Sequence, residues 1–185
     1  ALLFANTPEA IAPWGGSKAV FGTNPIAFAT PVAGSLPMVV DLSLSKVARG
    51  NIMKAKQEGK PIPEGWALGP DGEPTTDAEV ALKGTMVAMG DAKGAALALV
   101  VEILAAGLTG ANFANEATSF FDAEGAPPGT GQLIIAFDPK AFGGDGFAQR
   151  MATLAGLIEA QEGTRLPGRR RYANRDKAKQ DGILL

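Results

Sequence analysis

The longest apolar run of the chain extends from Gly90 to Gly110 and predicts a buried helix at the centre of the fold. Leucine and valine recur in it at steps of three and four, and alanine fills most other positions, a pattern that allows close packing on several sides. A helix that crosses a bilayer needs roughly 20 unbroken apolar residues. This run is too short and too closely bounded by glycine and aspartate to provide them, so a core helix is the better interpretation. The residues expected to face the core are Leu97, Val100, Val101, Leu104 and Leu108.

A second apolar run, 19–32, predicts a strand that is interrupted at 22–25. Pro25 cannot donate to a ladder of hydrogen bonds, and Thr23 lies between apolar flanks. The interruption is either a bulge that aims side chains at a ligand or an ordinary tight turn.

The run 38–44 predicts a strand that leads directly into a helix. Its alternation places Asp41 and Ser43 on one face, and Ser45 is expected to cap a helix over about 46–58. The strand should therefore deliver polar groups to a helix entrance.

The remaining pattern predicts short elements joined by long loops. A strand is expected over 132–137, and a short helix over about 76–82 lies in a proline-rich excursion. Asp145 is expected to cap an amphipathic helix. The expected anchors of the loop 112–131 are Phe113, Phe120 and Phe121.

Composition excludes several kinds of chemistry. The 185 residues are 46% hydrophobic with a mean hydropathy of +0.09, which is enough for one large domain or one and a half. The sequence has no cysteine and no histidine, so disulfides, thiolate chemistry, the commonest general acid/base and the commonest metal ligand are excluded, and we expect no metal site. The chain opens on a strand-like ALLF without methionine, so we expect a fragment of a longer protein.

Charge is concentrated near the end of the chain. A net charge of −2 gives no reason to expect nucleic acid or a membrane as a partner. However, seven of the 17 lysines and arginines lie within 165–179, and an LPG turn directly precedes Arg169, Arg170 and Arg171. The segment is either a solvated basic helix or an anion site, because adjacent guanidiniums can bind a phosphate. A nucleic-acid contact is the weaker interpretation, since Tyr172 is its single aromatic residue.

Two more segments suit polar or anionic ligands, although the sequence lacks a G-x-G-x-x-G fingerprint, a P-loop and a G-x-S-x-G elbow. One is the start of the central helix at Asp91, Ala92 and Lys93, where first-turn N–H groups favour an anion; a solvated lysine is the alternative. The other is the strand end at 41–43. If both converge with the arginines, they form a cradle for a dinucleotide.

Six segments, in order along nearly the whole chain, resemble a single family. They are FGTNPIAFATP (21–31), VVDLSLSKVARG (39–50), PIPEGWALGPDGEPTTD (61–77), MGDAKGAALALVVEILAAGLTG (89–110), IAFDP (135–139) and RLPGRRR (165–171). The chain resembles the malate/L-lactate dehydrogenase family of NAD(P)-dependent oxidoreductases, which is unrelated to the Rossmann-type lactate dehydrogenases. Its AKGAALAL, NEATSFFDAEGAPPGTGQ and RLPGRRR segments are most similar to the branch that reduces Δ1-piperideine-2-carboxylate and Δ1-pyrroline-2-carboxylate.

The resemblance implies an α/β fold with a mixed β-sheet packed with helices, a non-Rossmann NAD(P)-binding domain of the L-sulfolactate dehydrogenase-like type. Residues 1–143 would form the α/β cofactor-binding domain. Residues 144–185 would form an amphipathic helix and basic tail that return to an N-terminal helical part absent from this sequence. A cytoplasmic homodimer is expected, with a small 2-imino or 2-oxo acid as substrate and no nucleic-acid or membrane partner.

The resemblance also assigns roles to residues. The substrate pocket would include Thr23. No catalytic residue is assigned, because the family's catalytic histidine lies in the N-terminal part, so we expect this chain alone to be inactive. The expected cofactor-binding residues are Asp41, Leu42, Ser43, Ala92, Lys93, Arg169, Arg170 and Arg171.

The sequence thus predicts an NADPH-dependent reductase, with NADH possible, that transfers hydride to a cyclic 2-imino acid. The arginine triplet favours NADPH, because charge-assisted hydrogen bonds to a 2'-phosphate are strong. Two alternatives are a 2-oxo acid reductase of the malate/L-lactate dehydrogenase type and a non-catalytic nucleotide-binding or interface module.

Overall fold

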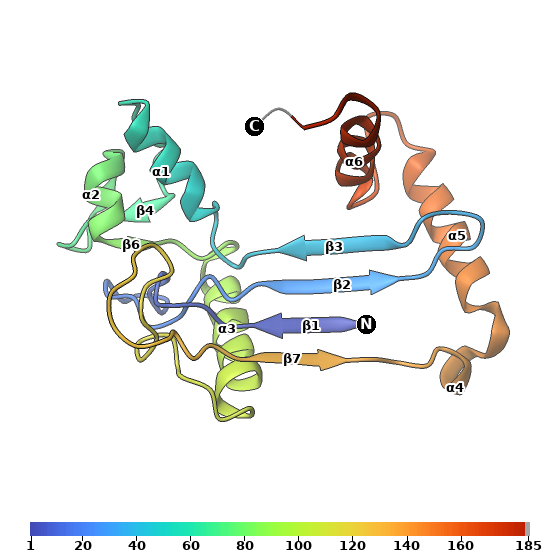
Figure 1. The fold of residues 1–185 in the computed structure, drawn as a ribbon, viewed down its shortest axis with the longest axis horizontal. Coiled ribbons are helices and arrows are strands. Elements are labelled where there is room, and N and C mark those ends of the chain that lie inside the picture. Colours follow the sequence, from blue (N-terminus) through green and yellow to red (C-terminus); the bar gives the residue numbers. More distant parts are fainter. Residues whose placement is uncertain (184–185) are drawn as a thin grey trace. The chain divides into compact units, whose positions relative to one another are not determined.

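The computed structural model describes residues 1–183. Its larger sheet has four strands, which Figure 1 shows. The strands lie in the order β3-β2-β1-β7. Strands β1 and β2 are antiparallel, because the backbone groups of Ala1 and Ala29 exchange hydrogen bonds of 2.9 and 3.0 Å and Ala5 N donates to Pro25 O at 3.1 Å. The bounds are β1 (Leu2–Ala5), β2 (Ile26–Thr30), β3 (Met38–Leu42) and β7 (Gln132–Ile135).

A smaller antiparallel sheet has the order β5-β4-β6. A bridge between Ile11 and Met86 is parallel, so both directions of strand pairing occur in the fold. The bounds are β4 (Ala67–Leu68), β5 (Pro74–Thr75) and β6 (Thr85–Met86).

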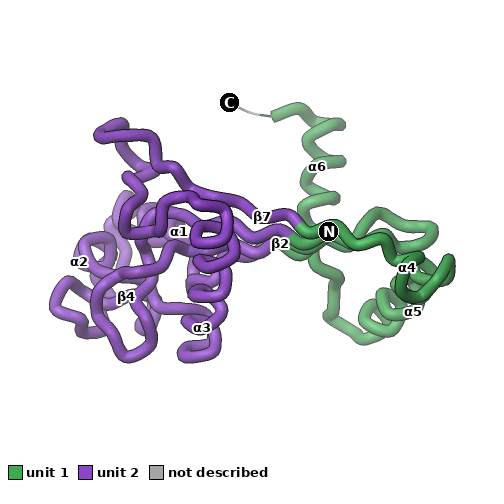
Figure 2. Tube along the Cα trace, turned by 90° about the horizontal axis from the view of Figure 1, so that it is seen from below, with its two compact units in different colours: residues 1–2, 27–41, 135–185 green, residues 3–26, 42–134 purple. Residues whose placement is uncertain are grey.

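The chain divides into two compact units, coloured separately in Figure 2. Unit 1 comprises residues 1–2, 27–41 and 135–185, and unit 2 comprises residues 3–26 and 42–134. The sequence predicts a boundary after residue 143, beyond which the tail would return to an N-terminal helical part. This boundary stays a prediction. The last two residues of that tail, 184–185, lie outside the described part.

The central helix of unit 2 is α3 (Asp91–Glu102), which continues as a π-helical turn, η1 (Ile103–Gly107). Three of the five residues expected to face the core do not do so. Leu97, Val100 and Leu108 are 36%, 45% and 66% exposed. The alanine face is buried instead, because small side chains let neighbouring backbone come close. The buried apolar side chains of the two segments are Ala95, Ala98, Val101, Ala105 and Ala106.

Helix α1 (Arg49–Gln57) begins three residues later than predicted. Ser45 does not cap it, because the Ser45 hydroxyl donates to Val47 O at 2.8 Å. Ala48 occupies the N-cap position and provides no side-chain cap. The helix is held instead by Ile52, which is fully buried.

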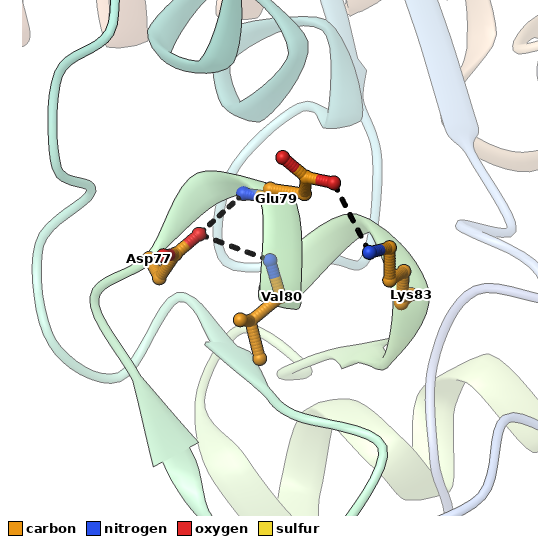
Figure 3. Close-up of polar contacts among 4 residues, drawn as sticks. All are labelled: Asp77, Glu79, Val80 and Lys83. Carbon is orange, nitrogen blue, oxygen red and sulfur yellow. Dashed lines mark hydrogen bonds and ion pairs between the residues drawn. The ribbon is translucent and has the colours of Figure 1, made fainter.

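Helix α2 (Ala78–Lys83) has the side-chain cap that α1 lacks (Figure 3). The Asp77 carboxylate accepts from Glu79 N at 2.7 Å and from Val80 N at 3.1 Å. Lys83 donates to Glu79 at 3.0 Å, and this contact lowers the pKa of the exposed Glu79 carboxyl. The predicted short helix in the proline-rich excursion is therefore present.

The helices of unit 1 follow β7. They are α4 (Lys140–Gly143), α5 (Phe147–Glu159) and α6 (Arg169–Asp181), with a 3₁₀ turn, η2 (Gly144–Gly146), before α5. The predicted cap at Asp145 is wrong, because Asp145 lies inside this turn and Gly146 precedes α5. The core of the unit joins Val32, Ala155 and Leu166, with Met38 and Ile158 packed against it. No helix within residues 1–183 is long and apolar enough to span a membrane.

Candidate functional site

The arginine triplet begins a helix in unit 1. Leu166 is buried in the core, and Gly168, with a φ of +83°, turns the chain so closely past β3 that an added Cβ would lie 3.1 Å from Val39 O. Arg169, Arg170 and Arg171 therefore occupy the first turn of α6, which contains no acidic residue. The helix dipole favours cations at the C-terminal end of a helix. Three arginines at the N-terminal end therefore concentrate positive charge where the dipole disfavours it.

Two of the three arginines are held by acidic residues. Arg171 Nη2 lies 2.9 Å from Asp41 Oδ2 at the end of β3, and Arg169 Nη2 lies 3.0 Å from Glu159 Oε1. Arg170 is exposed and makes no ion pair with any residue in 1–183. The structure thus brings together Asp41 and the triplet, which the sequence had placed in separate segments, and it leaves one guanidinium free.

In unit 2, the strand end meets the interruption at 22–25. Leu44 N donates to Thr23 O at 2.7 Å, and Thr23 N donates to Thr7 Oγ1 at 2.9 Å. The Thr23 and Thr7 hydroxyls lie 3.3 Å apart, and the Ser43 and Ser45 hydroxyls lie 3.0 Å apart. Thr23 and Ser43, predicted for substrate and cofactor respectively, therefore lie on neighbouring segments.

The hydroxyl groups of Thr7, Thr23 and Ser43 line a cavity of about 400 Å³ within unit 2. Its wall includes Phe120 and Phe121, which are 53% and 62% exposed and so are not the buried anchors expected from the sequence; Phe113 is also exposed. The residues of the wall with polar or aromatic side chains include Thr7, Glu9, Thr23, Ser43, Arg49 and Phe121.

The start of α3 is tied to the strand end by backbone hydrogen bonds. Met89 N donates to Leu44 O at 2.8 Å, and Lys46 N donates to Val87 O at 2.8 Å. Ala92 and Lys93 are exposed in the first turn of α3, and Lys93 makes no ion pair within the described chain. They share a unit with Ser43 and the exposed Leu42, but they do not line the cavity.

A buried polar network, which the sequence analysis missed, holds the segment 22–25 in place. Asn24 is fully buried with a φ of +40°, and its Nδ2 donates to Ala98 O at 2.9 Å and to Glu102 Oε2 at 2.8 Å. Glu102 Oε1 accepts from Ala114 N at 2.7 Å and from Asn6 Nδ2 at 3.4 Å. The available signal was Glu102 itself, the single charged residue in the stretch 94–110.

No group of three or more Asp, Glu, His or Cys that could hold a metal ion occurs among the residues that the structure describes.

The fold and these features define an α/β protein with a basic helix start beside a strand-end aspartate and no Rossmann fingerprint. The whole chain, residues 1–185, matches the family described as malate/L-lactate dehydrogenase, and the protein belongs to this family. The resemblance stated from the sequence is thereby confirmed.

Three relatives locate the chain within the family. It is 57% identical over 175 residues to a (2R)-3-sulfolactate dehydrogenase (NADP(+)) of Chromohalobacter salexigens, covering 95% of this chain and 52% of that protein. It is 46% identical over 177 residues to a Δ1-pyrroline-2-carboxylate reductase of Pseudomonas fluorescens, covering 95% and 53%. The crystal structure of the Δ1-piperideine-2-carboxylate reductase of Pseudomonas syringae pv. tomato matches with a TM-score of 0.91 and 41% identity, covering 100% and 56%.

The likeness to this solved structure confirms the predicted α/β, non-Rossmann fold. The chain spans about half the length of the relatives it matches.

Proposed function

We propose that the chain is the cofactor-binding portion of an NADPH-dependent oxidoreductase that reduces the C=N bond of a cyclic 2-imino acid. The observation that carries the proposal is the arginine triplet at the start of α6, with Arg170 free of ion pairs in residues 1–183. Support also comes from the relatives, since two of the three reported above are imino acid reductases.

The triplet fits the 2'-phosphate of NADPH. Several positive charges at a helix start repel one another and the helix dipole, so a bound dianion would relieve an unfavourable arrangement. Arg171 neutralises Asp41, an acidic side chain that would otherwise repel a phosphate nearby. In this proposal, Arg170 provides the main phosphate contact and Arg169 and Arg171 position it.

The cofactor would supply the hydride when bound, and the residues of this chain would bind and orient the cofactor and the substrate. Ala92 would provide its backbone N–H group and Lys93 its positive charge at the start of α3, where Asp91 N and Ala92 N have no acceptor among the described hydrogen bonds. Leu42 and Ser43 would contact the cofactor at the strand end, and Thr23 would line the substrate pocket. We assign no proton donor to this chain, which contains no histidine.

A substitution at Arg170 tests the cofactor role. We expect Arg170→Ala to raise the Kd for NADPH about tenfold or more, because a charge-assisted hydrogen bond is lost, and to change the Kd for NADH by less than about twofold. Titration followed by nicotinamide fluorescence measures both constants, and Arg150→Ala, an exposed arginine on α5, is the matched control. Equal weakening of both cofactors would refute the 2'-phosphate role.

A second candidate is the reduction of a 2-oxo acid, favoured by the 57% identity to the sulfolactate dehydrogenase. NADPH oxidation assays with Δ1-piperideine-2-carboxylate, Δ1-pyrroline-2-carboxylate and 3-sulfopyruvate separate the two candidates when this chain is joined to an N-terminal part that carries the family's catalytic histidine. NADPH binding by that joined protein without turnover of any of the three would support the third candidate, a non-catalytic nucleotide-binding module.

We also propose a cytoplasmic homodimer. The exposed apolar side chains of α3, of η1 and of the residue that follows η1 support association, because a surface of this kind is ordinarily covered; they include Leu97, Val100, Ile103 and Leu108.

A further inference from the structure

The loop 119–125 forms part of the wall of the cavity in unit 2. Ser119, Phe120 and Phe121 of this loop line the cavity, and Ala117 lines it just before the loop begins. The rest of the wall comes from segments within residues 7–49, which are distant in the sequence. A movement of the loop away from these segments therefore opens the cavity.

The two ends of the loop are fixed to each other and to unit 2. Thr118 Oγ1 donates to Ala126 O at 2.7 Å, and Asn112 Nδ2 donates to Pro128 O at 3.1 Å. Gly125 has a φ of +86°, and an added Cβ there would lie 3.0 Å from Thr118 Cγ2. The loop thus leaves unit 2 and returns to it at one place, as a lid on a hinge does.

Between these ends, the loop bonds to itself. Phe121 N donates to Ser119 Oγ at 3.0 Å, and Glu124 N donates to Asp122 Oδ1 at 3.1 Å. Among residues 1–183, no hydrogen bond or ion pair joins 119–125 to a residue outside the loop. The internal bonds persist wherever the loop lies, so they do not oppose its movement.

A single electrostatic contact holds the loop against the rest of the wall. The Phe121 ring centre lies 5.6 Å from the guanidinium carbon of Arg49. Arg49 is half-buried and is fixed by the hydrogen bond that its Nη2 donates to Leu82 O at 3.1 Å, whereas Phe121 is 62% exposed. A cation–π contact at an exposed site favours one position about twofold to fivefold. Both a closed and an open position of the loop are therefore populated.

The two phenyl rings relate the position of the loop to the contents of the cavity. Phe120 and Phe121 are both largely exposed, although both line the cavity. A ligand in the cavity gives these rings apolar surface to cover and removes them from water. Occupancy of the cavity therefore favours the closed position.

We infer that residues 119–125 are a lid over the cavity and that the contact of Phe121 with Arg49 holds this lid closed. The lid acts on any ligand that the cavity takes and excludes water from it when closed. Lids of enzymes open on the microsecond to millisecond timescale, which sets the measurement.

Fluorine NMR of the full chain grown with 4-fluorophenylalanine detects the movement. Each of the nine phenylalanines gives a resonance, and Phe120→Leu and Phe121→Leu assign the two on the lid. We expect relaxation dispersion with one common exchange rate at Phe120 and Phe121. Phe142, which is 80% exposed on α4, is the reference and should show no such exchange. We expect Arg49→Gln to raise the open population about twofold to threefold and Arg150→Gln to leave it unchanged.

Thiol labelling reports access to the cavity itself. The chain has no cysteine, so Ser43→Cys places a single thiol on the cavity wall. In this background, we expect Phe121→Leu to raise the rate of labelling by a thiol reagent about twofold to threefold, because it removes the contact with Arg49 and keeps an apolar side chain. Phe142→Leu is the matched control and should not change the rate.

Four results would overturn the lid. They are a Phe121 resonance without exchange, different exchange rates at Phe120 and Phe121, a labelling rate that Phe121→Leu leaves unchanged, and an exchange that depends on protein concentration. The last result would assign the two rings to a contact between copies of the chain. Circular dichroism reports whether each variant folds, and Arg49→Gln removes the same contact from the other side should Phe121→Leu fail to fold.

Discussion

At the scale of single residues, the buried amide of Asn24 is the least replaceable group of the candidate site. Asn24 adopts a left-handed conformation before a proline, and its Nδ2 donates hydrogen bonds to Ala98 O and Glu102 Oε2. Thr23 is its neighbour in the chain, so this network adds to the contacts of Thr7 and Leu44 that hold Thr23 in place. We expect Glu102 to act as a positioning residue for the cavity wall.

Truncation of Glu102 should be costly for stability. Glu102→Ala leaves Ala114 N and Asn24 Nδ2 with fewer acceptors inside the protein, so we expect the free energy of unfolding to fall by about 2–4 kcal/mol. Urea denaturation measures the change. Glu162→Ala, at an exposed position after α5, should change it by less than about 0.5 kcal/mol. A similar small effect at Glu102 would contradict the role of the network.

The sequence analysis singled out candidate site residues whose pattern is visible within a few neighbouring positions. Thr23, Asp41 and Ser43 follow from an interruption and an alternation within a few positions, and the structure brings Thr23 close to the strand end. Arg49 and Glu9 were not singled out, because the cavity whose wall they share joins segments far apart in the sequence. The binding roles of Thr23, Asp41 and Ser43 remain predictions.

At the scale of elements, the central helix shows how a pattern can predict an element and miss its orientation. The helix lies within the predicted run, but its buried face is the alanine face. Leucine ordinarily indicates the core side, yet here neighbouring backbone comes so close that only small residues fit. Gly131 is an example, since an added Cβ would lie 1.9 Å from Ala105 O.

Two helical glycines provide a matched test of this close packing. An added Cβ at Gly94 in α3 would lie 1.6 Å from Met89 O, whereas at Gly156 in α5 it would meet nothing within 4 Å. We expect Gly94→Ala to lower the free energy of unfolding by about 3 kcal/mol or more. We expect Gly156→Ala to raise it by about 0.5–1 kcal/mol, because alanine is the better helix former. Thermal denaturation distinguishes the two, and a tolerated Gly94→Ala would show that the start of α3 can move.

Helix starts were the least predictable boundaries. Ser45 and Asp145 had the composition of caps, but the Ser45 hydroxyl is engaged by Val47 O and Asp145 lies inside a 3₁₀ turn. Side chains of this kind satisfy turns as readily as helices, so composition alone cannot separate the two uses. Asp77, which does cap α2, has the same local signature.

At the scale of the whole molecule, the sequence predicted the α/β class and the family, because six segments in order carry far more information than any single motif. It did not predict the two compact units. Each gathers segments that are distant along the chain, and that arrangement depends on strand pairing that local patterns do not encode.

Association should depend on the apolar side of the central helix. Ile103 is 53% exposed at the start of η1, and we expect Ile103→Asp to shift a dimer to the monomer, because a buried unpaired charge is costly at an interface. Leu157→Asp, at a 65% exposed position on α5, is the matched control and should leave association unchanged. Analytical ultracentrifugation measures both. A wild-type monomer, or equal behaviour of both variants, would contradict this surface as the interface.

The division of unit 1 among residues 1–2, 27–41 and 135–185 has a practical consequence for dissecting the protein. No single cut of the polypeptide separates the two units: a cut after residue 134 keeps all segments of unit 2 in one piece, but it divides unit 1 between that piece and residues 135–185. A deletion from residue 144 onward, for example, strips Val32 and Met38 of Ala155, Leu166 and Ile158. Unit 1 can therefore be transplanted only together with unit 2, as the whole chain.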